Sequence, residues 1–329
     1  MPDSELLRLA QEFKDALEVQ DEIALQRIID AYGRIYRTLQ DKIDALLMEI
    51  ATMENHTKAA VSKLVRFEAL IEQVTQELTQ FQGYLRTEII AASELSFTTG
   101  AQQSQQLVEA LLQQAGIQAQ FNNLPTNSFE AILSFLQPDS PLYKRILLLA
   151  DTSAEYVRDT LLEAVALGYN PRKAATLIQD AFGRGLTDAL RMARTAQLWA
   201  SREAARANYL NNADIIKGWV WFASLDETVC ASCVAMHGTI HDLDEPLNDH
   251  HNGRCAPLPY IPEFGNPIEQ TGEDWFKAQS AERQASILGK GKFQAWKDGL
   301  FNFSQLSTET ENDVYGMMRT ETPLKDLIP

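Results

Sequence analysis

The sequence predicts a mainly α-helical protein with a small α+β lobe in its C-terminal part. Apolar residues recur at three- and four-residue steps through the first ninety residues, and no proline occurs between residues 3 and 124. At Gly218 the pattern changes to a short run of aromatic and β-branched residues. A length of 329 residues predicts about two domains, and 45% hydrophobic against 22% charged residues excludes wholesale disorder.

Residues 1–96 are predicted to form long helices packed as a hairpin or a coiled coil. Apolar side chains keep the helical period from Leu6 to Ile50 and again from Val61 to Ile89. The polar faces are acidic, whereas helices that lie on membranes are usually rich in Lys and Arg. Such a stripe is typical of a packing seam with another helix or a partner, so we expect self-association.

Residues 97–140 are predicted to be a Gln-rich connector with a short helix. Eight glutamines fall within 101–120, and no Lys or Arg occurs in 101–142. Ser128 is a suitable N-cap for a helix over 129–136.

Residues 141–300 are predicted to hold the main domain. A helical pattern ends at Gly168, which suits a left-handed C-cap, and Asn170-Pro171 combines a capping residue with proline at the first helical position. Gly183-Arg184-Gly185 is interpreted as a break before a helix over Leu186–Leu210.

Short extended segments follow this helix. A strand is expected at Trp219–Ala223, and the proline-rich stretch Pro257–Pro262 must be extended or looped. A last helix is expected over about Glu273–Leu288, ending at Gly289, and residues 301–329 are expected to be a tail.

The charge excludes some functions. Lys and Arg total 29 against 45 Asp and Glu, a net −16, which argues against a protein whose whole surface coats nucleic acid or anionic lipid. The longest apolar run is five residues, so no membrane span is expected, and the acidic start lacks the basic region of a secretory signal.

The only net-positive segment is 143–217, with 11 Lys and Arg against 8 Asp and Glu. Four arginines of the last helix in it fall within about 120° of one face: Arg191, Arg194, Arg202 and Arg206. This face could contact DNA phosphates or an acidic partner. Pairing with Asp188, Glu203 and other acidic residues is the alternative that we favour.

A metal site is predicted from the cysteines and histidines. All three cysteines and four of the five histidines lie between residues 230 and 255. Cys230-x2-Cys233 has the spacing of a zinc-binding turn, and Cys255 with either His250 or His251 would complete a tetrahedron. Three thiolates and one imidazole leave no open position, so the zinc would be structural.

Two other interpretations of the cysteines stay open. The thiols could be reduced and hold no metal, or Cys230 and Cys233 could form a labile pair. A redox motif is disfavoured because this Cys-x2-Cys is not expected at a helix start after a buried parallel strand.

A metal-dependent nuclease is the enzyme alternative. Asp249-His250-His251-Asn252 after a Cys-x2-Cys is similar to the ββα-metal nucleases, in which a histidine activates water on DNA. The helix that should follow is disfavoured by Pro257, Pro259 and Pro262. The sequence contains no phosphate-binding loop and no nucleophile elbow, so we expect no catalytic residues.

A set of motifs in a fixed order resembles the phage Mu F-like minor head proteins, also called phage head morphogenesis proteins, over roughly residues 143–300. The motifs are Gly168-Tyr169-Asn170-Pro171, Ala193-Arg194-Thr195, Trp221, Asp226, Cys230-x2-Cys233, Gly238, His250-x-Asn252-x-Arg254-Cys255, Trp275 and Ile287-Leu288-Gly289.

The resemblance implies a structural protein of a tailed phage and no enzyme. It implies a low-copy virion component inside the head near the portal vertex, assembled in the host cytoplasm, that acts in head assembly or in genome packaging and delivery. Its expected partners are the portal protein, the major capsid protein and packaged DNA, with neither a membrane nor a small-molecule substrate.

Two positions depart from the family pattern. Gly253 stands where the family commonly has a second cysteine, and Ala196 stands where a carboxylate often follows the Arg-Thr pair. The first departure leaves four metal ligands only if a histidine joins Cys230, Cys233 and Cys255.

Overall fold

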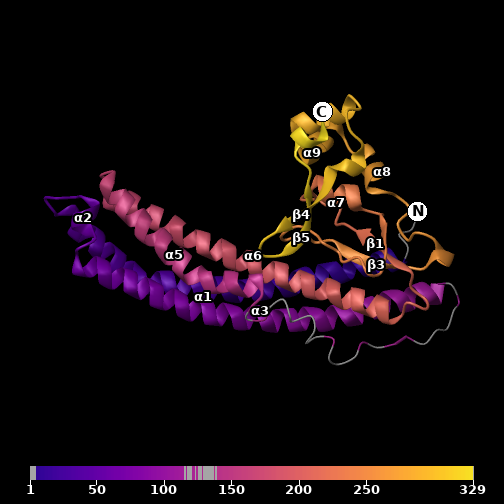
Figure 1. The fold of residues 1–329 in the computed structure, drawn as a ribbon, viewed down its shortest axis with the longest axis horizontal. Helices are drawn as coiled ribbons and strands as arrows, with labels where there is room; N and C mark the ends of the chain where they lie inside the picture. Colours follow the sequence, from indigo (N-terminus) through magenta and orange to yellow (C-terminus); the bar gives the residue numbers. More distant parts are fainter. Residues whose placement is uncertain are drawn as a thin grey trace. The chain divides into compact units, whose positions relative to one another are not determined.

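The computed structural model describes residues 5–114, 116, 121, 122, 124, 128, 137 and 139–328. It is mainly helical, with long helices first and small antiparallel sheets in the C-terminal part, which confirms the predicted fold class (Figure 1). The chain forms two compact units. Unit 1 comprises residues 1–20, 93–134 and 197–329, and unit 2 comprises residues 21–92 and 135–196.

The long helices contribute residues to both units or to unit 2 alone. They are α1 (Glu5–Ala51), α3 (Val65–Gln114), α5 (Pro141–Ala166) and α6 (Pro171–Asn211), with the short α2 (Lys58–Val61) between the first two. The smaller elements belong to unit 1. They are β1 (Gly218–Phe222), α7 (Ala231–Met236), β2 (Ile240–His241), β3 (Ala256–Tyr260), the 3-10 helix η2 (Pro262–Phe264), α8 (Gly272–Lys277), α9 (Ala281–Lys297), the 3-10 helix η3 (Phe303–Leu306), β4 (Ser307–Asn312), β5 (Gly316–Glu321) and α10 (Leu324–Leu327).

Unit 2 is a bundle of helical segments from α1, α3, α5 and α6. The first two run antiparallel, since Arg66 pairs with Glu49 near the turn and Arg27 pairs with Glu88 further along. Aromatic rings pack edge-to-face in the interior of this unit. The centroid of the Tyr32 ring lies 4.9 Å from that of Phe81 and 6.4 Å from that of Phe182.

The expected break at Gly183-Arg184-Gly185 is wrong, because α6 continues without interruption from Pro171 to Asn211. Glycine weakens a helix by about 1 kcal/mol relative to alanine and does not by itself end one. Gly185 has a packing reason: a methyl group there would collide with the hydroxyls of Ser153 and Tyr32.

The predicted caps between α5 and α6 are confirmed. Gly168 has φ +66°, and its neighbour Tyr169 donates its N–H to the Ala164 carbonyl, which closes the end of α5. The Asn170 side chain accepts the Lys173 N–H at 3.0 Å and begins α6.

Unit 1 is built on a three-stranded antiparallel sheet in the order β2-β1-β3. The central strand β1 is buried throughout, with Trp219 opposite both His241 and Pro259. The strand expected near residue 219 is confirmed as β1, and the proline-rich stretch is extended in β3, as expected. The sheet packs against α6, where the Tyr209 hydroxyl donates to the Pro257 carbonyl at 3.1 Å.

The last hundred residues differ from expectation in two ways. The expected single helix is divided into α8 and α9. The expected helix end at Gly289 is confirmed, since φ +72° and ψ 155° are non-helical there, and a second helical segment of α9 follows to Lys297. The expectation that residues 301–329 are a tail is wrong, because Ser307–Asn312 and Gly316–Glu321 pair as the hairpin β4–β5. The hairpin lies against α7 through a 2.9 Å hydrogen bond from Ser232 to Ser307.

The first part of the Gln-rich segment is helical, since α3 extends to Gln114. The helix expected over 129–136 lies outside the described residues. Among the helices that the structure describes, none combines the length and the apolar character that a membrane span requires.

Candidate metal centre

The Cys-x2-Cys turn lies at the start of a short helix. Cys230 is the N-cap of α7, and its sulfur accepts the Cys233 N–H at 3.4 Å. The motif therefore lies at a helix start. The strand before it, β1, is antiparallel to both of its neighbours, so the parallel-strand context of a redox motif is still not met.

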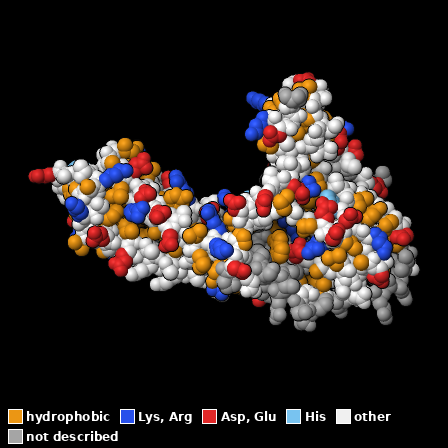
Figure 2. All heavy atoms as spheres, in the orientation of Figure 1, with side chains coloured by type: hydrophobic (Ala, Val, Ile, Leu, Met, Phe, Trp, Pro, Cys, Tyr) orange, Lys and Arg blue, Asp and Glu red, His pale blue; other side chains and the backbone are white. Residues whose placement is uncertain are grey.

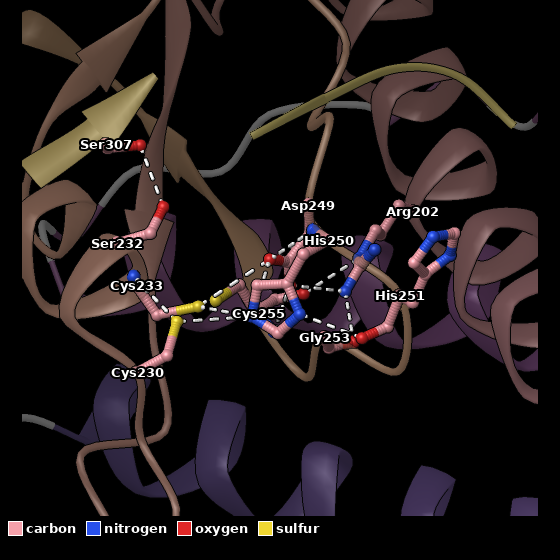
Figure 3. Close-up of polar contacts among 10 residues, drawn as sticks. All are labelled: Arg202, Cys230, Ser232, Cys233, Asp249, His250, His251, Gly253, Cys255 and Ser307. Carbon is pink, nitrogen blue, oxygen red and sulfur yellow. Dashed lines mark hydrogen bonds and ion pairs between the residues drawn. The ribbon is translucent and has the colours of Figure 1, made fainter. Parts of the chain in front are cut away.

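Two thiols and one imidazole converge in front of this turn. The Nε2 atom of His250 lies 3.3 Å from Cys230 Sγ and 3.2 Å from Cys233 Sγ. Cys255 joins from the strand side, because its sulfur, Cys233 Sγ and an Asp249 oxygen lie within 4.8 Å of one another. Figure 3 shows the three sulfur atoms gathered on one side of the His250 ring.

The structure places His250, and not His251, beside the sulfurs. His250 Nδ1 lies 2.8 Å from the His251 carbonyl oxygen, which can only accept, so Nδ1 carries the proton. The other ring nitrogen, Nε2, is directed at the thiols and could bind a metal ion once it has lost its proton. The His251 ring packs edge-on against Tyr315, with centroids 4.6 Å apart, and lies on the far side of His250 from the sulfurs (Figure 3).

Asp249 holds the loop that carries His250. Its carboxylate is buried and accepts hydrogen bonds from the backbone N–H groups of His250 at 2.8 Å and Cys255 at 3.2 Å. The Arg202 guanidinium donates to the same carboxylate at 2.9 Å, and also to the carbonyls of Gly253 and Cys255. One buried ion pair therefore fixes the backbone on both sides of the candidate ligands.

Gly253, where the family pattern has a cysteine, lies against this pair. A Cβ atom at position 253 would collide with the Asp249 carboxylate. In this chain the Asp249 side chain occupies the space that a residue 253 side chain would need. The close approach of the Asp249 carboxylate therefore requires glycine at position 253.

The protonation of the cluster is strongly coupled. Hydrogen bonds donated by Cys233 and by His250 lower the pKa of Cys230 to about 5 despite its burial. Burial opposes the charged form of His250, but the hydrogen bond to Cys230 and the negative charges of Asp249 and Cys230 raise its pKa to about 10. The Cys230 and Cys255 side chains, together with burial, raise the pKa of Cys233.

This donor set fits a metal ion. The ligand atoms of Cys230, Cys233 and His250 lie within 4.8 Å of one another, and the Cys255 sulfur lies within the same distance of Cys233. A thiolate-rich set with one imidazole suits zinc. Binding would displace the protons that the thiols and His250 share. The cluster could therefore hold a metal ion with little rearrangement of the turn and the loop.

The four arginines predicted as a contact face are engaged in ion pairs. Arg191 lies 3.5 Å from Asp188, and Arg194 lies 2.5 Å from the buried Asp21. Arg206 binds Glu203 at 2.6 Å.

Arg202 is buried against Asp249 and is not on an exposed face. The favoured alternative, pairing with acidic residues, describes all four. On the face that Figure 2 draws, basic and acidic side chains are interspersed and no extended positive patch is visible.

A comparison with protein-family models assigns the region around this cluster to a family. Residues 155–265 match the model described as Phage Mu protein F like protein. This segment is a Mu F-like domain. No curated protein and no solved structure matches the chain.

The Mu F-like domain contains all the candidate ligands. The turn at Cys230, the loop at His250 and the strand start at Cys255 lie within the matched span, as does Arg202. The family resemblance is confirmed for residues 155–265. The match ends before Trp275, so α8 and α9 lie outside it.

Sequence reasoning missed three residues that surround the cluster. Asp249 and Arg202 are 47 positions apart, and only the fold brings them together. Lys14 comes from α1, outside the Mu F-like domain, and its buried position was not foreseen. The only available signal was an Asp directly before the candidate histidine.

Proposed function

We propose that this protein is a structural minor head protein of a tailed phage, located inside the head near the portal vertex. It assembles in the host cytoplasm and acts in head assembly or in genome packaging and delivery. The observation that carries the proposal is the Mu F-like domain over residues 155–265. Its role is structural, and a zinc ion bound by Cys230, Cys233, His250 and Cys255 stabilises the fold of the domain.

The donor set supports a structural role for the metal. Three thiolates and one imidazole would fill a tetrahedral zinc ion, so no position is left for a substrate or an activated water. The ligands come from a helix cap, a loop and the first residues of a strand, which one ion would tie together. In a lobe made of short elements, such an ion contributes directly to folding stability.

The nuclease alternative has less support from the geometry. The chain after His251 enters β3, where the ββα-metal arrangement would have a helix with a further ligand. His250 Nε2 faces two cysteines, and His251 packs on Tyr315. Neither contact is that of a general base poised over a water molecule.

The partners follow from the same proposal. The main partners are the portal protein or the major capsid protein. The long helices would mediate self-association, and packaged DNA would be a further contact. The ion pairs of Arg191, Arg194 and Arg206 make these side chains weaker candidates for phosphate binding than free arginines would be.

Mass spectrometry of purified particles tests the proposal. In particles of the phage that encodes this chain, we expect the protein at a small fraction of the abundance of the major shell protein. Its absence from mature particles would contradict the proposal.

A plasmid incubation with Mg²⁺ or Mn²⁺ tests the enzyme alternative. We expect no cleavage by the purified protein. Cleavage that is lost in a His250→Ala/His251→Ala double variant would replace the structural role with a nuclease role.

A further inference from the structure

A lysine from the first helix is buried beside the candidate metal centre. Lys14 lies on α1 and is only 7% exposed, and its Nζ makes no hydrogen bond to any residue that the structure describes. The ammonium lies 4.7 Å from the centroid of the Phe222 ring. An ammonium removed from water without a hydrogen-bond acceptor is costly, so this position calls for a compensating negative charge.

The candidate ligand that shares a cavity with Lys14 is Cys255. Burial lowers the pKa of Lys14 to about 8, and the side chains of Cys255, Asp249 and Glu18 oppose this shift. Lys14 and Cys255 line the same small cavity, of about 60 Å³, between α1, α3, α6 and β3. Most of the other residues around it are apolar, such as Phe13 and Leu107, so charges there are weakly screened.

A metal ion at the cluster would leave a net charge that Lys14 could balance. A divalent ion bound by three thiolates and a neutral imidazole carries one net negative charge. The nearby Arg202 is already balanced by the Asp249 carboxylate. The buried centre would therefore keep an unbalanced negative charge unless another cation lies close to it.

We propose that Lys14 is the charge partner of the metal centre at Cys255, so that metal binding and the seating of the start of α1 on the Mu F-like domain stabilise each other. This inference rests on the metal site of the proposed function and adds a residue from outside the domain. Lys14 acts through the ligand and is a positioning residue.

A second contact one turn along α1 supports the coupling. Glu18 accepts from Arg254 at 2.9 Å, and Arg254 also pairs with Asp226 at 2.6 Å. Lys14 and Glu18 are four residues apart and lie on one helix face, so α1 presents both to the adjacent residues Cys255 and Arg254. With metal bound, the charges would be complementary: Lys14 shares a cavity with the ligand Cys255, and Glu18 pairs with Arg254.

Zinc affinity of the full chain tests the inference. We would compare the wild type, Lys14→Met and Arg8→Met by competition with a chromogenic chelator at pH 7. Methionine keeps the length of the lysine side chain without its charge. Arg8 is the matched control on the same helix, because its side chain is 55% exposed and pairs with Glu12. We expect zinc affinity to fall about tenfold or more in Lys14→Met and to stay unchanged in Arg8→Met.

Thermal unfolding of the metal-free protein separates this role from simple packing. Without metal, Lys14→Met removes an unpaired buried charge, so we expect its unfolding temperature to equal or exceed that of the wild type. With zinc bound, we expect it to be lower than that of the wild type.

Three outcomes would overturn the inference. Equal zinc affinity in wild type and Lys14→Met would overturn the inference alone, and so would destabilisation of the same size with and without metal. A wild type that binds no zinc would overturn the metal site as well.

Discussion

His250 receives its role from a single hydrogen bond. Its Nδ1–H donates to the His251 carbonyl, which turns Nε2 toward Cys230 and Cys233, whereas the His251 ring contacts Tyr315. We expect His250→Ala to abolish stoichiometric zinc binding and His251→Ala to retain it, measured by zinc release on thiol modification. Equal loss in both variants, or loss only in His251→Ala, would contradict the assignment.

Arg202 is expected to matter for stability more than any exposed arginine. Its side chain is 9% exposed, and it neutralises Asp249, which is 1% exposed. Burial alone would raise the pKa of Asp249, but Arg202, His250 and two backbone N–H groups outweigh it, so the pKa is lowered and the carboxylate stays charged.

We therefore expect Arg202→Met to lower the unfolding free energy by about 3 kcal/mol, because it leaves a buried charge uncompensated. Arg191→Met should cost less than about 1 kcal/mol, since that pair is exposed. Urea denaturation measures both. Similar losses in the two variants would contradict a special role for Arg202.

His237 predicts a pH dependence of stability. Burial and the neighbouring Lys14 lower its pKa to about 4, and its Nδ1 accepts the Ala223 N–H at 3.1 Å. In the unfolded chain the pKa is about 6.5, so below that pH the unfolded state binds more protons than the folded state. The stability from neutral His237 is complete above pH 6.5 and is lost as pH falls toward 4.

We expect His237 to account for about 3 kcal/mol of that loss. The measurement compares urea denaturation of chelator-treated wild type and His237→Gln from pH 7.5 to 4, and the difference between the two curves isolates this residue. Parallel curves would contradict the assignment.

At the residue scale the sequence was sufficient to single out the candidate ligands and insufficient to predict their surroundings. Cys230, Cys233 and Cys255 share a short window, so spacing alone brought them to attention. Asp249, Arg202 and Lys14 meet only through contacts across the fold, and no local pattern marks such contacts. Choosing between His250 and His251 required the side-chain orientations.

Long elements were predictable because their apolar period repeats many times. The stripe from Leu6 to Ile50 corresponds to α1, Glu5–Ala51. The hairpin β4–β5 was missed because Ser307–Asn312 is polar at every position and lacks the alternation that identifies a half-buried strand. The sequence alone did not indicate that α6 continues across Gly183 and Gly185, because the continuity of the helix depends on its packing against neighbouring helices.

The two glycines of α6 provide a test of that helix. No atom outside the helix lies near the position of a methyl group at Gly183, whereas Ser153 and Tyr32 fill that position at Gly185. We expect Gly183→Ala to raise the unfolding free energy by up to about 1 kcal/mol, because alanine favours the helix.

Gly185→Ala should lower the unfolding free energy by about 1–3 kcal/mol through overpacking. Thermal and urea unfolding of the two variants give the comparison. Effects of the same sign and size would show that close packing at Gly185 is not important.

At the scale of the whole molecule, the Mu F-like match and the compact units do not coincide. Residues 155–196 of the match lie in unit 2, and residues 197–265 lie in unit 1 with the candidate metal centre. Unit 1 also contains the start of α1 and the end of α3, which lie outside the match. The chain length predicted about two domains, but a helix shared between units leaves no composition change that would mark the boundary.

The account as a whole depends on the Cys/His cluster being a metal centre. The most direct measurement is elemental analysis with zinc X-ray absorption on full-length protein purified under reducing conditions without chelator. We predict one zinc per chain, bound by three sulfur atoms at about 2.3 Å and one imidazole nitrogen at about 2.0 Å. A fully folded protein that contains no metal, or zinc bound through oxygen atoms, would contradict the account.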